Sequence, residues 1–254
     1  MLRTYRADLH IHTCLSPCGD LTMSPRAIVE KAREMNIDIL GICDHNTAEN
    51  VPAVQEAAEE YRISVLPGME VTTQEEIHIL ALFDNNHSAW ALQEMIYGRL
   101  EGTNDDDAFG LQVVVNKDGE VLSFNKRLLI GATSIPVEEV VQAIHSLGGL
   151  AIASHVDKSA FSLISQLGFV PENLALDALE VSRHHDIESA GSEFDPHAKE
   201  HRGTGLPFTR SSDAHFPDEV GTSCTLFLLK EGTLKEIKMA FEKKQDRKIL
   251  DYES

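Results

Sequence analysis

Short apolar runs rich in Ile, Val and Leu recur along this chain, and amphipathic helical patterns follow several of them. The runs that indicate strands cover residues 38–45, 64–73, 77–83, 150–156, 178–183, 208–215 and 222–229. The helical patterns cover residues 24–36, 50–61, 136–149 and 233–244. Strands that alternate with helices are typical of parallel βαβ units. The sequence therefore predicts an α/β protein with a parallel sheet, either a barrel or an open sheet.

Residues 86–135 interrupt this alternation. They contain a β-hairpin pattern at 113–124 around Asp118-Gly119, a dipeptide that favours tight hairpin turns. The chain has 254 residues, of which 42% are hydrophobic, and this is enough to form the buried core of one large α/β domain. We predict a single domain over 1–254 with an insertion at about 86–135.

Acidic residues outnumber basic ones, 41 to 22, which gives a formal net charge of −19. Tight binding of nucleic acid backbones needs clustered Lys and Arg, so we expect no long nucleic acid as a partner. A small anionic substrate held by metal ions is still allowed. The four cysteines do not form the pattern of a disulfide scaffold. Because no leader pattern and no long apolar run is evident, we expect a cytoplasmic protein without membrane contact.

Candidate metal ligands fall at or just past the ends of the predicted strands. They are His10, His12, His45, Glu70, His155, Asp213 and His215. In parallel α/β folds, sites are built at the C-terminal ends of the strands. Mixed histidine nitrogens and carboxylate oxygens suit Zn, Mn or Fe, and this many candidates exceed the needs of one ion. Glu70 is placed to bridge two ions.

The first strand adds a pattern of alternation. Asp8, His10 and His12 lie two residues apart, with Leu9 and Ile11 between them. Residues two apart share one face of a strand, so three ionisable side chains would share a buried face and would need partners there. We predict that a metal supplies those partners and that Asp8 orients a ligand histidine.

Six motifs follow one another along the chain. They are DLHIH (8–12), CDHNT (43–47), PGMEVTT (67–73), HIL (78–80), SHV (154–156) and SSDAH (211–215). In this order they resemble the PHP superfamily, named for polymerase and histidinol phosphatase, over most of the chain outside 86–135. The resemblance implies a distorted (β/α)7 TIM-like barrel with a hairpin-containing insertion. It also implies two or three divalent metal ions (Zn, Mn or Fe) at the C-terminal face.

Carried over motif by motif, the resemblance implies three overlapping ligand sets. The first is His10, His12, Glu70 and Asp213; the second is Glu70, His78 and His155; the third is His45, His215 and one ligand from the loop after the first motif. In that loop many relatives have Ser-Asp-Gly, whereas this chain reads SPCGD. Cys18 takes the equivalent place, and Asp20 follows it. Both side chains are chemically competent ligands, and we favour Cys18.

Together these features predict a metal-dependent phosphoesterase that hydrolyses a small phosphorylated substrate, a phosphomonoester or a short nucleotide, with metal-activated water. Glu70 belongs to the predicted catalytic centre, and the candidates for its acid are Asp44, His45 and His215; Asp44 is alternatively a helix N-cap. The candidates for phosphate binding, or alternatively for surface ion pairs, are Lys158, Arg183 and Arg210. His184 and His185 are candidates for the substrate mouth or, alternatively, solvated residues of a loop.

Three other functions fit the same residues. One is a 3'-to-5' exonuclease on short oligonucleotides, and another is a metal-dependent C–N hydrolase. The third is a non-catalytic metal-binding regulatory module, for which a missing ligand would be expected. Since every ligand position holds a competent residue, we favour an enzyme.

Overall fold

The computed structural model describes residues 1–183 and 205–253. Its strands are β1 (Arg3–Ile11), β2 (Ile39–Ile42), β3 (Ser64–Thr72), β4 (His78–Leu82), β5 (Val113–Val115), β6 (Val121–Phe124), β7 (Leu150–Ala153), β8 (Ala178–Val181), β9 (Phe208–Arg210), β10 (Cys224–Leu229) and β11 (Lys248–Glu253). Its α-helices are α1 (Pro25–Glu34), α2 (Val51–Ala58), α3 (Asn86–Tyr97), α4 (Asp106–Phe109), α5 (Val137–Ser146), α6 (Leu163–Leu167) and α8 (Leu234–Phe241). Short 3-10 turns are η1 (Glu59–Tyr61) and η3 (Pro217–Glu219).

The predicted helix ends reflect local capping chemistry. Helix α1 begins after Ser24, whose hydroxyl accepts a hydrogen bond from the amide of Ala27, and Pro25 occupies its first turn. Helix α8 begins in the same way at Thr233. After α5 the chain turns at Gly148, whose φ of +78° lies in the left-handed region that glycine adopts without strain.

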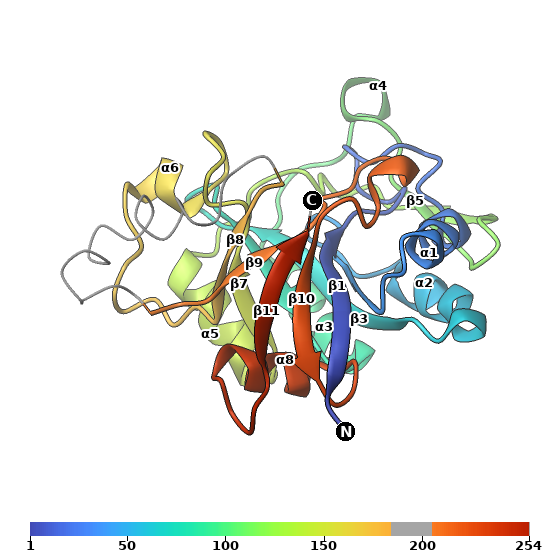
Figure 1. The fold of residues 1–254 in the computed structure, drawn as a ribbon. Coiled ribbons are helices and arrows are strands. Elements are labelled where there is room, and N and C mark those ends of the chain that lie inside the picture. Colours follow the sequence, from blue (N-terminus) through green and yellow to red (C-terminus); the bar gives the residue numbers. More distant parts are fainter. Residues whose placement is uncertain (184–204, 254) are drawn as a thin grey trace.

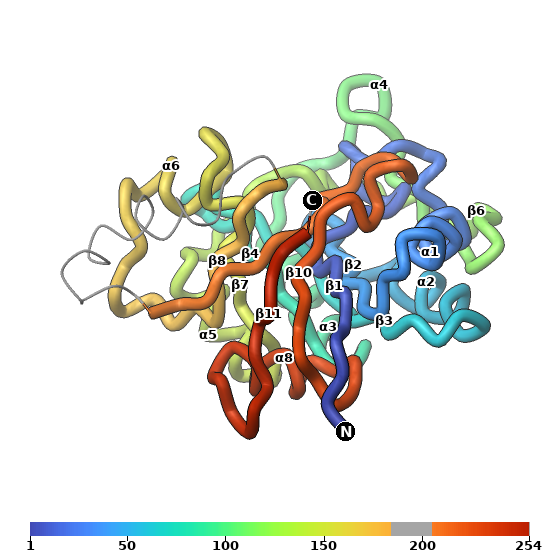
Figure 2. The backbone as a smooth tube through the Cα atoms, in the orientation of Figure 1, coloured from blue at the N-terminus to red at the C-terminus, as the bar shows by residue number. Residues whose placement is uncertain are grey.

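Nine strands form one curved sheet in the order β11-β10-β1-β2-β3-β4-β7-β8-β9. Figure 1 shows β10 and β11 beside β1, and Figure 2 traces both ends of the chain to this part of the sheet. The sheet curls until its edges meet. The Thr225 hydroxyl of β10 bonds both the amide and the carbonyl of Arg210 in β9, and the Tyr252 hydroxyl of β11 donates to the carbonyl of Phe208. The structure thus confirms the distorted TIM-like barrel.

Strand β4 departs from the predicted parallel pattern. Strands β1, β2 and β3 are parallel, as are β7, β8 and β9, but β4 is antiparallel to both β3 and β7. Residues 73–77 join β3 to β4. A parallel crossover takes about a dozen residues or more, so this short link permits only a hairpin. The first residue of β4 therefore lies at the same end of the barrel as the last residues of the parallel strands.

Two apolar clusters line the two faces of the barrel sheet. The inner cluster is Tyr5, Ala7, Leu9, Ile39, Cys43, Leu66, Leu80, Leu82, Leu150, Ile152, Ala178, Phe227 and Leu229, closed off by Leu234, Ile237, Ala240 and Phe241 of α8. The outer cluster joins the alternate strand residues, such as Ile79 and Ala81, to helices α1, α2, α3 and α5. Figure 1 shows α8 at the lower end of the strands, so the inner cluster fills that end of the barrel.

The predicted hairpin at 113–124 is present as β5 and β6, which pair antiparallel. Asn50 attaches it to the barrel, because its side chain donates to the carbonyl of Val113 and accepts from the amide of Val115, both at 3.0 Å. Helix α3, at the start of the predicted insertion, packs into the outer cluster. Within the described ranges, no helix has the length and apolar character that crossing a membrane requires.

Candidate metal centre

The predicted ligands converge at the end of the barrel opposite α8. His10 and His12 come from the end of β1, Glu70 from β3, and His78 from the start of β4. His45, His155, Asp213 and His215 follow β2, β7 and β9. His78 joins them because β4 runs antiparallel, which is why its position near a strand start is compatible with the site.

The alternation predicted for β1 is wrong in one respect. Leu9 packs in the inner cluster and Ile11 in the outer cluster, so these two residues do not share a face. The pairing of β1 with β2 shifts register between Asp8 and Ile11, as in a β-bulge. Such bulges re-aim side chains, often beside active sites. Here the bulge leaves His10 and His12 among the ligands but separates Asp8 from them.

Asp8 therefore does not orient a histidine. Its two carboxylate oxygens accept hydrogen bonds from the backbone amides of Ser212 and Gly221, each at 2.9 Å. Burial raises the pKa of Asp8 to about 6, against the lowering effect of these hydrogen bonds. The role of Asp8 is to fix the segment after β9, which carries Asp213 and His215.

Glu70 lies at the middle of the cluster. Its Oε1 is 3.0 Å from His78 Nδ1 and 3.3 Å from His155 Nε2. Its Oε2 is 3.3 Å from His45 Nδ1 and 3.5 Å from Nε2 of both His10 and His12. Each carboxylate oxygen thus faces a different group of histidine nitrogens, which is the arrangement that a bridging ligand requires.

Hydrogen bonds fix the orientation of three histidine rings. Nδ1 of His10 lies 2.9 Å from a carboxylate oxygen of Glu180, which can only accept, so this nitrogen carries the proton. Nδ1 of His215 donates in the same way to the carbonyl of Asp213 at 2.7 Å. In both rings Nε2 is left to bind a metal. Sequence reasoning missed Glu180, although an acid between Leu179 and Val181 in an apolar strand was a signal.

The third ring, His12, is oriented through a chain of hydrogen bonds. The Ser16 hydroxyl donates to Asp44 at 2.6 Å and lies 2.9 Å from Nδ1 of His12. Because the hydroxyl proton is committed to Asp44, the serine oxygen accepts from His12. Asp44 also accepts from the amide and hydroxyl of Thr13, both at 2.7 Å. This buried carboxylate holds the loop after β1, an engagement that weighs against the predicted role of catalytic acid. It is not an N-cap either, since α2 follows Asn50.

The loop after β1 presents Cys18 and not Asp20 to the cluster. Cys18 groups with His12, His45 and His215, whose ligand atoms all lie within 4.8 Å of one another. The carboxylate of Asp20 instead accepts from the amide and hydroxyl of Thr22. The backbone amide of Asp20 donates to the carbonyl of His215, which holds the loop in place. A tight turn at Gly19 permits this, because a Cβ there would lie 2.5 Å from the carbonyl oxygen of Thr13.

The ionisable groups of the cluster differ in charge. Burial lowers the pKa of His12 to about 4 and that of His45 well below its usual value. For His10, burial acts in the same direction, but the carboxylates of Glu180, Asp213 and Glu70 outweigh it and raise the pKa well above the usual range. A proton on His10 thus balances part of the surrounding negative charge. A divalent ion among the same atoms would supply that charge more fully.

Several buried polar atoms in the centre have no hydrogen-bond partner. They are Nδ1 of His45, His78 and His155, Oε1 of Glu70 and Oε1 of Glu180. Unsatisfied buried polar groups are costly and rare, so a concentration of them in one place indicates a missing partner. Among the residues that the structure describes, ligand atoms close enough to share an ion form three groups, namely His10–His12–Glu70, His45–Glu70–His78 and His12–Cys18–His45–His215. These atoms fit divalent metal ions in number and chemistry.

Two of the predicted ligands have unusual backbone conformations. His155 has a φ of +28° and Asp213 a φ of +51°, both in the left-handed region that non-glycine residues seldom adopt. Such strain costs about 1–3 kcal/mol per residue and concentrates at functional sites. The short segments after β7 and β9 therefore hold their side chains toward the cluster at some cost to stability.

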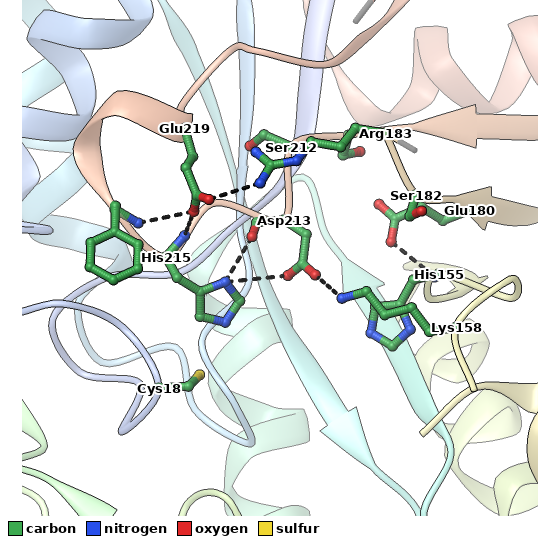
Figure 3. Close-up of a pocket in the computed structure, with 12 residues that line it drawn as sticks. Cys18, His155, Lys158, Glu180, Ser182, Arg183, Ser212, Asp213, His215 and Glu219 are labelled. Atoms are coloured by element: carbon green, nitrogen blue, oxygen red, sulfur yellow. Dashed lines mark hydrogen bonds and ion pairs between the residues drawn. The ribbon is translucent and has the colours of Figure 1, made fainter. Parts of the chain in front are cut away.

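Two adjoining pockets open onto the centre, with volumes of about 360 and 370 Å³. His155, Lys158, Asp213 and His215 line both. Figure 3 shows the Lys158 ammonium directed at the carboxylate of Asp213, with which it forms an ion pair. Arg183 lies in the pocket of about 360 Å³, where its guanidinium is 2.9 Å from Glu219. The two cations are thus placed beside the metal centre.

The third predicted phosphate-binding residue lies elsewhere. Arg210 is buried in β9 and lines neither pocket, and its charge acts on Tyr252 of β11. Its position before the SSDAH motif suggested a place in the site. Successive side chains of a strand point to opposite faces, however, and that of Arg210 lies on the face away from the site. His184 and His185 lie outside the described residues.

The comparisons with known proteins agree with this arrangement. A family model described as the PHP domain matches residues 8–97, and one described as PHP-associated matches residues 199–245. The 5'-3' exoribonuclease of Haemophilus influenzae is 28% identical over 192 residues, which cover 60% of this chain and 69% of that protein. The 5'-3' exoribonuclease Rnm of Salmonella typhimurium is 27% identical over 256 residues, which cover 83% and 85%.

Among solved structures, endonuclease Q from Pyrococcus furiosus shares the fold, with a TM-score of 0.71 at 18% identity over 98% of this chain. A complex of endonuclease Q with a 27-mer duplex substrate gives a TM-score of 0.72 at 18% identity over 97% of this chain. This chain spans only 58% of the endonuclease Q chain.

These relatives overturn the expected partners, a small phosphorylated substrate and no long nucleic acid. Two relatives are named exoribonucleases, and endonuclease Q was solved with a duplex substrate. The physical error was to apply the net charge of −19 to the site. Net charge is a sum over the whole chain, whereas a partner responds to the charges of the face that it meets, and Lys158 and Arg183 lie beside the metal ligands.

The ordered motifs, the barrel and the family matches lead to one assignment. The prediction of an enzyme that hydrolyses phosphoric esters is confirmed at the level of its class, and the alternative of a non-catalytic module is set aside. The chain contains a PHP domain, matched over residues 8–97, and it is a metal-dependent hydrolase.

Proposed function

We propose that this chain is a 5'-to-3' exonuclease that acts on RNA through two or three bound divalent metal ions, Zn, Mn or Fe. The observation that carries the proposal is the buried cluster of ligand atoms around Glu70, open to a pocket that holds Lys158 and Arg183. The names of the curated relatives support the direction of cleavage, in place of the 3'-to-5' alternative.

The three groups of ligand atoms indicate which residues hold the ions. His10, His12 and Glu70 would hold one ion, and Asp213, whose Oδ1 lies 3.3 Å from His12 Nε2 and 3.4 Å from His10 Nε2, completes that set. His45, Glu70 and His78 would hold a second ion, and His155, whose Nε2 lies 3.3 Å from Oε1 of Glu70, would be a further ligand. A third ion would lie among His12, Cys18, His45 and His215.

The bound ions would neutralise charge on the phosphoryl oxygens and lower the pKa of water to about 7. The protein's own residues prepare that chemistry. Glu180 and Ser16 hold the Nδ1 protons of His10 and His12, so that both rings offer Nε2. Lys158 and Arg183 attract the phosphates of the strand. Neither Asp44 nor His215 is free to deliver a proton to the leaving oxygen, because Asp44 is engaged with Ser16 and Thr13, while Nδ1 of His215 donates to a carbonyl and its Nε2 would bind the third ion.

The size of the pockets favours removal of terminal nucleotides. Each pocket falls within the range of about 300–1,000 Å³ typical of small-molecule sites, which suits one nucleotide at a time. The two pockets adjoin at Lys158 and Asp213. One end of a strand can therefore occupy both pockets while the scissile phosphate lies at the metal centre.

A labelled substrate tests this proposal. Protein purified without chelator, and supplemented with Mn²⁺, is incubated with a short oligoribonucleotide that carries a labelled 5' phosphate. A 5'-to-3' exonuclease releases the labelled mononucleotide as its first product. A 3'-to-5' exonuclease leaves the label on a ladder of shortened strands, and release of labelled inorganic phosphate would indicate a phosphomonoesterase; either result would overturn the proposal. The variant Glu70→Gln serves as the inactive control.

A further inference from the structure

Two exposed phenylalanines lie in the pockets of the metal centre. Phe161 is 43% exposed and lines the pocket of about 370 Å³. Phe216 is 53% exposed and lines the pocket of about 360 Å³. Single exposed apolar residues are common on protein surfaces, so exposure alone decides nothing. What distinguishes these two residues is that each is anchored by groups of the site, Phe161 through its ring and its backbone and Phe216 through its backbone.

Phe161 is fixed against a candidate metal ligand. Its ring stacks on that of His78, with ring centroids 4.9 Å apart and an angle of 15° between the planes. Its carbonyl accepts the amide hydrogen of His78 at 2.9 Å. Its φ of +56° is strained for a side chain with a Cβ. Neither burial nor local backbone preference therefore explains why a phenylalanine stands here with part of its ring open to the pocket.

Phe216 is fixed through Glu219. One carboxylate oxygen of Glu219 accepts from the amide of Phe216 at 3.3 Å and from the amide of His215 at 2.9 Å. The other oxygen pairs with Arg183 at 2.9 Å. A single acidic side chain thus links the backbone of Phe216, a candidate metal ligand and a cation of the same pocket. Phe216 is the N-cap of the 3-10 turn η3, so its backbone is supported on both counts.

We infer that Phe161 and Phe216 are stacking platforms for the two bases on either side of the scissile phosphate of an unpaired strand. Aromatic rings stack on nucleobases of any sequence, because every base has a π-face. The inference rests on the proposed function and specifies how the strand is held. Bases in a duplex already stack on one another, so both platforms can be used only by unpaired nucleotides.

Hydrogen-bond donors distinguish the two pockets and indicate the order of the nucleotides. The pocket of Phe216 contains the guanidinium of Arg183, which Glu219 holds in place by an ion pair, in addition to the Lys158 that both pockets share. That pocket therefore suits the first nucleotide with its 5' phosphate. Phe161 then stacks on the base of the second nucleotide, across the metal centre.

The test combines protein variants with abasic substrates. The probes are a 5'-phosphorylated oligoribonucleotide and two copies of it, each with an abasic unit at the first or at the second position. Phe161→Ala should lower kcat/KM on the intact probe by about 5- to 150-fold, mainly through KM. It should have little effect on the probe that is abasic at the second position. Phe216→Ala should behave in the same way toward the first position.

Matched variants separate stacking from structural support. Phe161→Trp should restore most of the lost kcat/KM, because a larger ring still stacks. Phe169→Ala removes a ring that is 54% exposed and lines neither pocket, and it should leave all three probes unaffected. Equal losses on intact and abasic probes, or a loss of bound metal in Phe161→Ala, would assign the ring to supporting His78 and would overturn the inference.

A binding measurement keeps this test independent of the proposed function. If the wild-type protein cleaves none of the probes, the proposed function fails, and affinities are measured by fluorescence anisotropy with phosphorothioate copies of the same probes. Weaker binding of the abasic copies that disappears in the alanine variants would still support the stacking platforms. Equal affinities for intact and abasic copies would exclude them.

Discussion

The two ends of the barrel interior are equally buried but chemically opposite. The boundary between the two ends runs between Glu70 and Leu80, which pair directly across β3 and β4 and are 1% and 0% exposed. Leu80 belongs to the inner apolar cluster that α8 closes, whereas Glu70 is surrounded by histidines. Burying apolar side chains stabilises the fold, while burying charged groups costs free energy unless they are paired. The difference indicates that the apolar end stabilises the barrel, whereas the end with Glu70 and the histidines provides the chemistry of the site.

The largest expected effect comes from Glu70→Gln. Although burial opposes ionisation of Glu70, the neighbouring His78 and His10 lower its pKa well below the usual range, so it acts as a carboxylate. The neutral amide cannot replace a bridging carboxylate. We expect kcat/KM to fall by roughly 1,000-fold, the scale seen when one preorganised charged group is removed, together with loss of bound metal. Elemental analysis and a nuclease assay on the same preparation measure both.

The fold should survive that change, because Glu70 contributes to the site and not to the apolar cluster. Far-UV circular dichroism of Glu70→Gln should match that of the unchanged protein. Full activity or full metal content in this variant would show that Glu70 is not part of the centre. The two ends of the barrel would then not differ in the way described.

The opposite end should respond in the opposite way. Leu80→Ala removes a fully buried side chain from the inner cluster, and we expect the free energy of unfolding to fall by about 2–5 kcal/mol. The metal content per folded chain should not change, since Leu80, although paired with Glu70 across the two strands, offers no ligand atom to the site. Denaturant unfolding and elemental analysis check the two halves of this statement. If Leu80→Ala also lost metal, the two ends would not be independent.

The strand and helix patterns predicted a parallel α/β fold but left a barrel and an open sheet as alternatives, and the family resemblance was needed to choose the barrel. The positions of the motifs predicted most of the residues that the cluster brings together. The motifs sit at strand ends, and strand ends meet at one edge in a parallel sheet, so residue type and spacing carried that information. His78 needed the family resemblance, because the reversed direction of β4 depends on the short link 73–77. The bulge near Leu9 escaped prediction because strand register is set by pairing with neighbours. Strand β11 was also missed, since its exposed, charged sequence lacks an apolar run.

A smaller effect is expected at Glu180, which was found only from the structure. Its Oε2 accepts from Nδ1 of His10 at 2.9 Å and from the backbone amide of His155 at 3.2 Å. In Glu180→Gln the amide oxygen can still accept, but without the charge. We expect metal affinity or activity to fall by about 10- to 100-fold, the usual effect of altering a group that orients a metal-binding histidine. A metal titration followed by calorimetry measures it, and Glu180→Ala should show the larger loss.

The smallest effects concern the loop after β1, where two residues compete for one role. Cys18 lies with His12, His45 and His215, whereas the carboxylate of Asp20 is bonded to Thr22. Cys18→Ala should therefore lower the metal content by up to one ion per chain, and Asp20→Ala should leave it unchanged. Replacing the bound metal with Co²⁺ gives a second readout, because a thiolate ligand adds a near-ultraviolet charge-transfer band that Cys18→Ala would abolish. A band that persists in Cys18→Ala, or metal lost only in Asp20→Ala, would show that the loop rearranges when metal binds. The site end of the barrel would then be adaptable where the apolar end is fixed.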